Sequence, residues 1–182
     1  MIDKICLINW TLDAHHAKLI VEKAKGNMNL ESSEIFHERG VALGGYDVVA
    51  YYKDRVARKG RLDLVHSWKG LEWWFSSEEY LGLFKASPET YLPEYGGFCA
   101  FGASQGYKAA TKPYAFHLEG DKLYFNFARY VQKRWMETKS EKIKHADLTW
   151  DEVKSTVPIK ASPMLIWWKY KFLKFFGKDL FE

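Results

Sequence analysis

The sequence predicts an α+β fold, in which a small antiparallel sheet of two hairpins carries packed helices and helical extensions lie at both ends. Two strand–turn–strand patterns are separated by a glycine-rich stretch, and a helical pattern follows each of them. The chain has 182 residues, of which 47% are hydrophobic, so it can bury one core. We expect an N-terminal helix and linker over residues 1–39, a central domain over residues 40–157, and an amphipathic segment over residues 158–182.

The first half of the central domain contains a hairpin followed by a helix. The run "YDVVAYY" is β-branched and aromatic, which is typical of a strand. The runs "LDLVHSWKG" and "LEWWFS" predict two strands that meet in a turn at Lys69 and Gly70. Ser76 or Ser77 can then cap a helix over "SEEYLGLFKAS", because acidic residues lie in its first turn and Pro88 follows its end.

The second half begins with a loop and ends in helices. The stretch "YLPEYGGFCAFGASQGY" contains too many glycines for a regular element. A second hairpin follows over "YAFHLEGDKLYFNF", with "EGDK" as its turn. Apolar residues at Val131, Trp135, Ile143 and Ala146 then favour one or two helices. The run "GASQGYKAATKP" lacks the spacing of a phosphate-binding loop, so we interpret it as a plain loop.

The two ends of the chain have helical patterns of their own. Thr11 can cap a short helix that stops at Gly26. Near the C-terminus, aromatic residues form a broad apolar face and lysines form a stripe. This segment can anchor the protein at a membrane surface, or dock on the domain itself or on a protein partner. The candidate contact residues are Trp167, Trp168, Lys171, Phe172, Lys174, Phe175 and Phe176.

Composition narrows the class of protein. The formal net charge is +4, and the lysines are spread along the chain, so we expect no nucleic-acid partner. Two cysteines far apart in the sequence do not resemble a disulfide framework, which favours a reducing compartment. No signal peptide or membrane-spanning run is recognisable. We therefore expect a cytoplasmic protein that can lie peripherally at a membrane, while its oligomeric state stays open.

Several motifs in the middle of the chain resemble the YHS domain family. They are "GGYDVVAYY", "WKGLEWWFSSEEYLGLFKASPETYLPEYGGFCAFG" and "GDKLYFNFARYVQKRW…ADLTW", which together cover about residues 44–150 in the expected order. The motif Tyr-Gly-Gly-Phe-Cys-Ala is similar to that of the branch of small bacterial YHS domain-containing proteins. The resemblance implies a YHS-like core for this chain.

The metal-handling branch of that family has cysteines that this chain lacks. Framework residues of that branch that are in register here are Asp47, Phe75, Phe84, Pro88 and Tyr91. Where that branch has cysteines, this chain has Ala50, Ser76 and Tyr80. A methyl group and neutral hydroxyls cannot replace thiolates as ligands of a soft metal. The resemblance therefore implies the fold but not that metal site.

Cys99 is the candidate functional thiol, because some members of the small-protein branch are similar to selenoproteins at the matching position. That similarity implies thiol redox chemistry or binding of a soft metal ion such as copper at Cys99. His66 and His117 lie in predicted strands and are the candidate metal-ligating or activating partners. A buried packing role for Cys99 is the alternative, and whether the chain is an enzyme stays open. The second functional hypothesis is a non-enzymatic binding or scaffold domain, tethered through its C-terminal segment.

Overall fold

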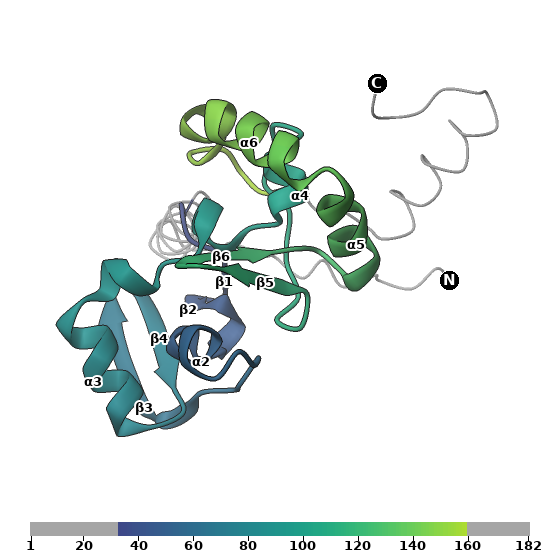
Figure 1. The fold of residues 1–182 in the computed structure, drawn as a ribbon. Coiled ribbons are helices and arrows are strands. Elements are labelled where there is room, and N and C mark those ends of the chain that lie inside the picture. Colours follow the sequence, from purple (N-terminus) through teal and green to yellow (C-terminus); the bar gives the residue numbers. More distant parts are fainter. Residues whose placement is uncertain (1–32, 160–182) are drawn as a thin grey trace, which may run out of the picture. The chain divides into compact units, whose positions relative to one another are not determined.

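The computed structural model describes residues 33–159, which combine strands and helices (Figure 1). The strands are β1 (His37–Glu38), β2 (Val41–Ala42), β3 (Arg61–Trp68), β4 (Leu71–Phe75), β5 (Phe116–Glu119) and β6 (Lys122–Phe125). The helices are α2 (Val48–Lys53), α3 (Glu78–Ala86), α4 (Ala100–Ala103), α5 (Arg129–Glu137) and α6 (Lys139–Val153). Short 3-10 helices are η1 (Leu43–Gly45), η2 (Pro88–Tyr91) and η3 (Glu94–Gly97). The α+β class is confirmed, while both predicted terminal helices lie outside the described residues.

The first hairpin lies where the sequence predicts it. β3 and β4 are antiparallel, and Trp68 lies opposite Leu71. Lys69 and Gly70 form the turn with φ angles of 49° and 74°, the left-handed backbone that two-residue hairpin turns need. β4 also pairs in parallel with β2, which pairs with β1, so the sheet has the order β1-β2-β4-β3. The sheet is therefore mixed, whereas the prediction was purely antiparallel.

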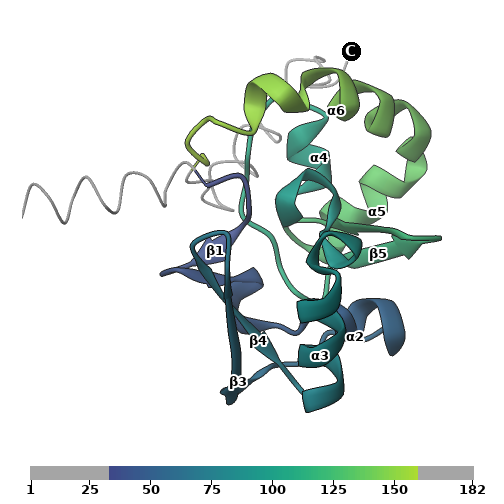
Figure 2. The ribbon, with the colours of Figure 1, turned by 90° about the vertical axis from the view of Figure 1, so that its left-hand side faces the viewer.

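Helix α3 packs against this sheet and begins at a predicted serine cap (Figure 2). The Ser77 hydroxyl accepts a hydrogen bond from the amide of Tyr80 at 3.2 Å. Phe84 of α3 is fully buried, and its ring centroid lies 4.9 Å from that of Trp73 and 5.1 Å from that of Phe75. Burying one such ring contributes about 2–3 kcal/mol to stability, so this aromatic cluster fixes the helix on the sheet.

The segment around Asp47 is a helix, which corrects the strand predicted from its β-branched residues. Asp47 Oδ1 accepts hydrogen bonds from the amides of Val49 at 2.9 Å and Ala50 at 3.3 Å, and so caps α2. Val48, Val49, Ala50 and Tyr51 are all buried. Because strand propensity reflects packing more than backbone preference, the cap and the burial on all sides decide the outcome.

The second predicted hairpin is present as β5 and β6, with Glu119 opposite Lys122 at the turn. It forms a two-stranded sheet of its own, so the prediction that both hairpins share one sheet is wrong. Tyr51 of α2 packs edge-on against Phe116 and Phe125, whose ring centroids lie 4.8 Å and 5.0 Å away. Side-chain packing, rather than strand pairing, therefore joins the second hairpin to α2.

Helices α4, α5 and α6 lie on the opposite side of the second hairpin from α2 (Figures 1 and 2). Trp135 of α5 is fully buried, with its ring centroid 5.1 Å from that of Tyr124 in β6. Ala146 of α6 is buried in the same cluster. The predicted helical region after the second hairpin therefore forms two helices. None of the helices within residues 33–159 has the length and apolar composition that crossing a bilayer requires.

Lys108 is a buried cation that connects the two ends of the described range. Its ammonium group donates hydrogen bonds to the carbonyl oxygens of Ser33 at 3.1 Å and Lys154 at 2.8 Å. It also lies 4.9 Å from the centroid of the Phe98 ring. The Lys108 carbonyl accepts a hydrogen bond from the amide of Ile159 at 2.8 Å. Burial lowers the pKa of Lys108 to about 8, because the charged form has lost its hydration.

We expect the free energy of unfolding to gain a pH-dependent contribution from Lys108. Above about pH 8 the native lysine loses its proton, whereas the unfolded chain keeps one up to about pH 10. The unfolded state then binds more protons, so this contribution rises with pH, by up to about 1.4 kcal/mol per pH unit. Urea denaturation of the native chain and of Lys108→Met at about pH 7, 8 and 9 measures the difference.

The Lys108→Met variant removes the titrating amine and retains an apolar side chain of similar length. Burial raises the pKa of the Cys99 thiol, so the free energy of unfolding falls with pH above about pH 8.5 because of this group. Both proteins contain Cys99, so its contribution cancels in the difference between them. Parallel stability curves for the two proteins would contradict the prediction.

Candidate functional site

Cys99 lies within the glycine-rich segment, two residues after Gly97 and immediately before α4. Gly96 and Gly97 in η3 have φ angles of +60° and +81°, which glycine adopts without strain. The amide of Cys99 donates a hydrogen bond to the carbonyl of Ala109 at 3.1 Å, and Cys99 forms an isolated parallel bridge with Phe125 of β6. The segment is therefore held on both sides by backbone pairing.

The Cys99 thiol is enclosed in the core, with 2% of the residue exposed. Its Sγ accepts a hydrogen bond from the amide of Phe127 at 3.3 Å and lies 3.8 Å from Oδ1 of Asn126. Burial raises the pKa of the thiol above its ordinary value. This effect outweighs the amides of Gly102, Phe127 and Phe101, which act in the opposite direction. The thiol is therefore neutral near pH 7, although three backbone amides lie close to the sulfur.

We expect native Cys99 to react with iodoacetamide at least about 100-fold more slowly than the same thiol in the urea-unfolded chain. The thiolate is the reacting form, and in the native protein it is both scarce and inaccessible. Mass spectrometry over time in a Cys6→Ser background measures the rate at Cys99 alone. Equal rates in the two states would show an accessible thiol and would favour the redox hypothesis.

The structure places His66 and His117 in different sheets. His66 lies on β3 with its ring centroid 6.2 Å from that of Phe84. His117 lies on β5 against Trp135, at 5.9 Å, and burial lowers its pKa. Within residues 33–159, no hydrogen bond joins either histidine to Cys99, and no group of three or more His, Cys, Asp or Glu side chains could hold a metal ion. The predicted copper-type ligand set is therefore not assembled in this part of the chain.

The predicted membrane or partner contacts cannot be compared with the structure. Trp167, Trp168, Lys171, Phe172, Lys174, Phe175 and Phe176 lie outside the described residues. Their role stays a prediction.

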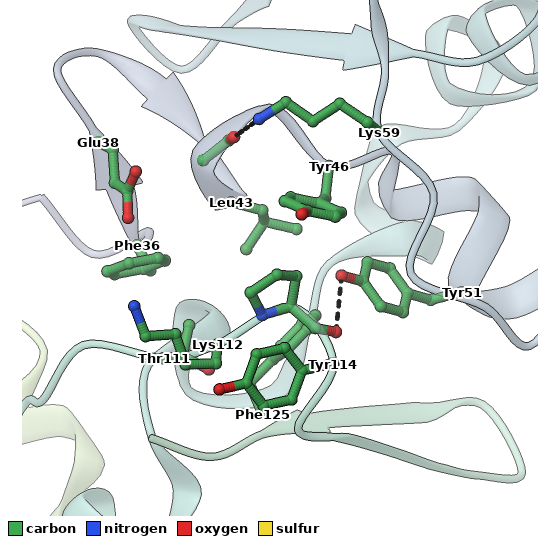
Figure 3. A pocket seen from close by; sticks show the side chains of 12 residues that line it. Phe36, Glu38, Leu43, Tyr46, Tyr51, Lys59, Thr111, Lys112, Tyr114 and Phe125 are labelled. Atoms are coloured by element: carbon green, nitrogen blue, oxygen red, sulfur yellow. Dashed lines mark hydrogen bonds between the residues drawn. The ribbon is translucent and has the colours of Figure 1, made fainter. Parts of the chain in front are cut away.

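A pocket of about 290 Å³ lies beside the glycine-rich segment, between η1 and residues 111–114 (Figure 3). Phe36, Leu43 and Phe125 give it an apolar base, and Tyr46 and Tyr114 add aromatic rings. Charged side chains also line it: Glu38, Lys59 and Lys112. Apolar walls with a few polar groups are typical of small-molecule sites, and this volume is at the small end of their range.

One wall of the pocket is η1, whose backbone is fixed from two directions. Leu43, Gly44 and Gly45 all have positive φ angles. The Lys59 ammonium group donates a hydrogen bond to the Gly44 carbonyl at 2.6 Å. Behind the wall, a Cβ atom at Gly97 would lie 2.6 Å from Cδ2 of Leu43. The glycine-rich segment therefore supports the pocket from the rear, because only glycine at position 97 leaves room for Leu43.

The opposite wall is the segment 111–114, which is also anchored by hydrogen bonds. The Thr111 hydroxyl donates to the carbonyl of Asn126 at 3.0 Å, and the Lys112 amide donates to the same oxygen at 3.1 Å. The Tyr51 hydroxyl donates to the Pro113 carbonyl at 3.1 Å (Figure 3). Since both walls are held by the core, the pocket is formed before any ligand arrives, which lowers the entropy cost of binding.

Two charged side chains of the pocket are unpaired. Glu38 and Lys112 are exposed, and neither side chain forms a hydrogen bond or ion pair with another residue in the described range. Lys59, by contrast, is engaged by Gly44 and lies 4.8 Å from the Tyr46 ring centroid. Lys112 cannot be recognised as a site residue from the sequence, because the pocket forms only when distant segments between Phe36 and Phe125 come together in the fold.

A scan against protein-family models finds no match for this chain, and searches of curated proteins and of solved structures find none either. The resemblance to the YHS domain family stays a prediction.

Proposed function

We propose that residues 33–159 form a non-enzymatic binding domain whose ligand site is the pocket between η1 and residues 111–114. The observation that carries this proposal is a preformed pocket with an apolar base and two unpaired charged side chains, Glu38 and Lys112. A group that is held ready and unpaired in the free protein can pair with a ligand without first breaking an internal contact.

The thiol-redox and copper hypothesis receives less support from the geometry. Cys99 is buried, its pKa is raised, and neither His66 nor His117 is hydrogen-bonded to it among the described residues. A reactive or metal-binding thiol needs a thiolate that reagents or ions can reach. Cys99 serves better as a packing residue in the core beside Phe125 and Asn126, and the alkylation experiment above tests this role.

We also propose that the core is YHS-like, as the sequence motifs suggest. In support, three of the framework residues, Asp47, Phe75 and Phe84, take part in contacts within the core. Asp47 Oδ2 accepts hydrogen bonds from the amide and hydroxyl of Ser76, at 2.7 Å and 2.6 Å. The Phe75 and Phe84 rings lie 5.1 Å apart. Ser76 thus acts as a hydrogen-bond donor where the metal-handling branch has a cysteine.

A fragment screen on the full chain tests the binding function. We expect small organic fragments to shift the backbone amide resonances of Leu43, Gly44 and Thr111 in two-dimensional NMR spectra, because these residues line the pocket. Leu43→Phe places a larger ring at the base, so fragments that bind the native protein lose at least about tenfold in affinity.

Leu62→Phe is the matched control, since Leu62 is 75% exposed on β3 and does not line the pocket. It should leave fragment binding unchanged. Circular dichroism establishes whether Leu43→Phe folds. If it does not, Tyr114→Ala at the exposed rim replaces it and should weaken binding of aromatic fragments. Fragments that bind only outside the pocket, or no binding at all, would overturn the proposal.

A further inference from the structure

The charges around the pocket are arranged unevenly. Glu38 and Lys59 both flank Gly44: a Cβ atom at Gly44 would lie 3.4 Å from the Glu38 carboxyl carbon, and Lys59 donates to the Gly44 carbonyl at 2.6 Å. Opposite charges on the two sides of one residue largely offset each other at this rim. The η1 side of the pocket is therefore close to neutral overall.

The other rim is positive. Lys112 has no acidic partner in the described range, and the Arg129 guanidinium lies 5.5 Å from the centroid of the Tyr114 ring, also without an ion pair there. Tyr114 is 46% exposed, and no described residue binds its hydroxyl. Figure 3 shows Lys112 and Tyr114 across the pocket from Lys59, with the Lys112 ammonium group near Phe36. Lys112 and the Tyr114 hydroxyl thus provide a cation and a free donor that can recognise a carboxylate, and the Arg129 charge lies beside the Tyr114 ring.

The space between the rims suits a carbon skeleton. Phe36, Leu43 and Phe125 offer only apolar atoms at the base, and Tyr46 adds an aromatic face. A volume of about 290 Å³ holds roughly ten non-hydrogen atoms, at the roughly 30 Å³ that each water molecule occupies in the liquid. Because the η1 rim is close to neutral overall, a second negative charge on the ligand would meet no net positive charge there.

Resting on the binding function proposed above, we propose that the pocket takes a small organic monoanion with an apolar or aromatic body. Its carboxylate lies at the rim of Lys112 and Tyr114, and its body packs on Phe36, Leu43 and Phe125. The near-neutral η1 side offers no net positive charge to a second carboxylate, so monoanions are preferred over dicarboxylates. The chemistry at the pocket is reversible recognition, and no bond in the ligand is made or broken.

The test compares three probes of similar or smaller size by NMR titration of the full chain. Phenylacetate carries the charge and the ring, phenylacetamide is its neutral counterpart, and succinate is a dianion. We expect phenylacetate to bind at the pocket at least about fivefold more tightly than phenylacetamide or succinate. Raising the salt concentration should weaken phenylacetate binding and leave phenylacetamide binding unchanged.

Variants that remove a single positive charge test whether Lys112 binds the carboxylate of the ligand. Lys112→Met should weaken phenylacetate binding at least about fivefold without changing phenylacetamide binding. Lys122→Met is the matched control, because Lys122 is an exposed lysine at the start of β6 that does not line the pocket, and it should change neither. Lys112 is exposed, so its substitution leaves the fold intact.

The possible failures separate the ligand class from the binding function. If phenylacetamide binds the pocket as tightly as phenylacetate and Lys112→Met has no effect, the anion proposal is overturned while the binding function stands. If succinate binds most tightly, the monoanion selection is wrong. If no probe binds but other fragments do, the ligand class is again overturned, whereas a pocket that takes neither probes nor fragments overturns both proposals.

Discussion

Replacing Asp47 by alanine is expected to lower the free energy of unfolding by about 3–4 kcal/mol. The carboxylate is fully buried and accepts four hydrogen bonds, two from the amides of Val49 and Ala50 and two from Ser76. Alanine would remove the cap of α2 and leave the Ser76 amide and hydroxyl without their acceptor inside the protein. One side chain therefore connects the start of α2 to the end of β4.

Urea denaturation measures the Asp47→Ala effect, with two variants for comparison. Asp47→Asn keeps one carbonyl oxygen as an acceptor and should lose less stability than alanine, since some of the four hydrogen bonds survive. Asp121→Ala removes an exposed carboxylate in the turn between β5 and β6 and should stay within about 0.5 kcal/mol of the native chain. Equal stability of Asp47→Ala and Asp121→Ala would show that the buried network contributes nothing.

The elements that the sequence predicts correctly are those fixed by neighbouring residues. The turn at Lys69 and Gly70 requires two left-handed residues, and the flanking strands alternate around it. Helix α3 has a serine cap at Ser77 and a proline just beyond its end at Pro88. Such signals act over a few residues, so they can be recognised without knowing the rest of the fold.

The predictions that fail depend on contacts between distant segments. The run that begins at Val48 has strand-like residues, yet it is a helix because Asp47 caps it and residues 48–51 are buried against α3 and the second hairpin. The pairing of Val41 with Glu72 in parallel is equally invisible in the sequence, since two-residue strands carry no periodic pattern. Local propensity cannot decide which sheet a strand joins.

The candidate site also depends on contacts between segments that are distant in the sequence. The motif around Cys99 draws attention to the thiol, but its 2% exposure results from packing against Asn126 and Phe127, nearly thirty residues away in sequence. The pocket gathers side chains from residues between Phe36 and Phe125, and no local pattern marks them. The glycines of the motif are informative in another way, because they reveal a place where backbone must come close to backbone.

Replacing Gly96 by alanine is expected to lower the free energy of unfolding by about 3 kcal/mol or more. Gly96 has a φ angle of +60°, and a Cβ atom there would lie 1.7 Å from the carbonyl oxygen of Glu34. Relief of that overlap must move backbone, which also strains the hydrogen bond from the Phe36 amide to the Gly96 carbonyl, at 2.8 Å. The segment before β1 would then detach from η3.

The matched control for Gly96→Ala is Gly82→Ala, which makes the same chemical change in a different environment. Gly82 is exposed in the middle of α3, and nothing lies within 4 Å of a Cβ atom placed there. Alanine has the higher helix propensity, so this variant should gain about 0.5–1 kcal/mol of stability. Urea denaturation should therefore give a lower free energy of unfolding for Gly96→Ala than for the native chain, and a higher one for Gly82→Ala. A Gly96→Ala variant as stable as the native chain would mean that residues 34–36 do not contact η3 in solution.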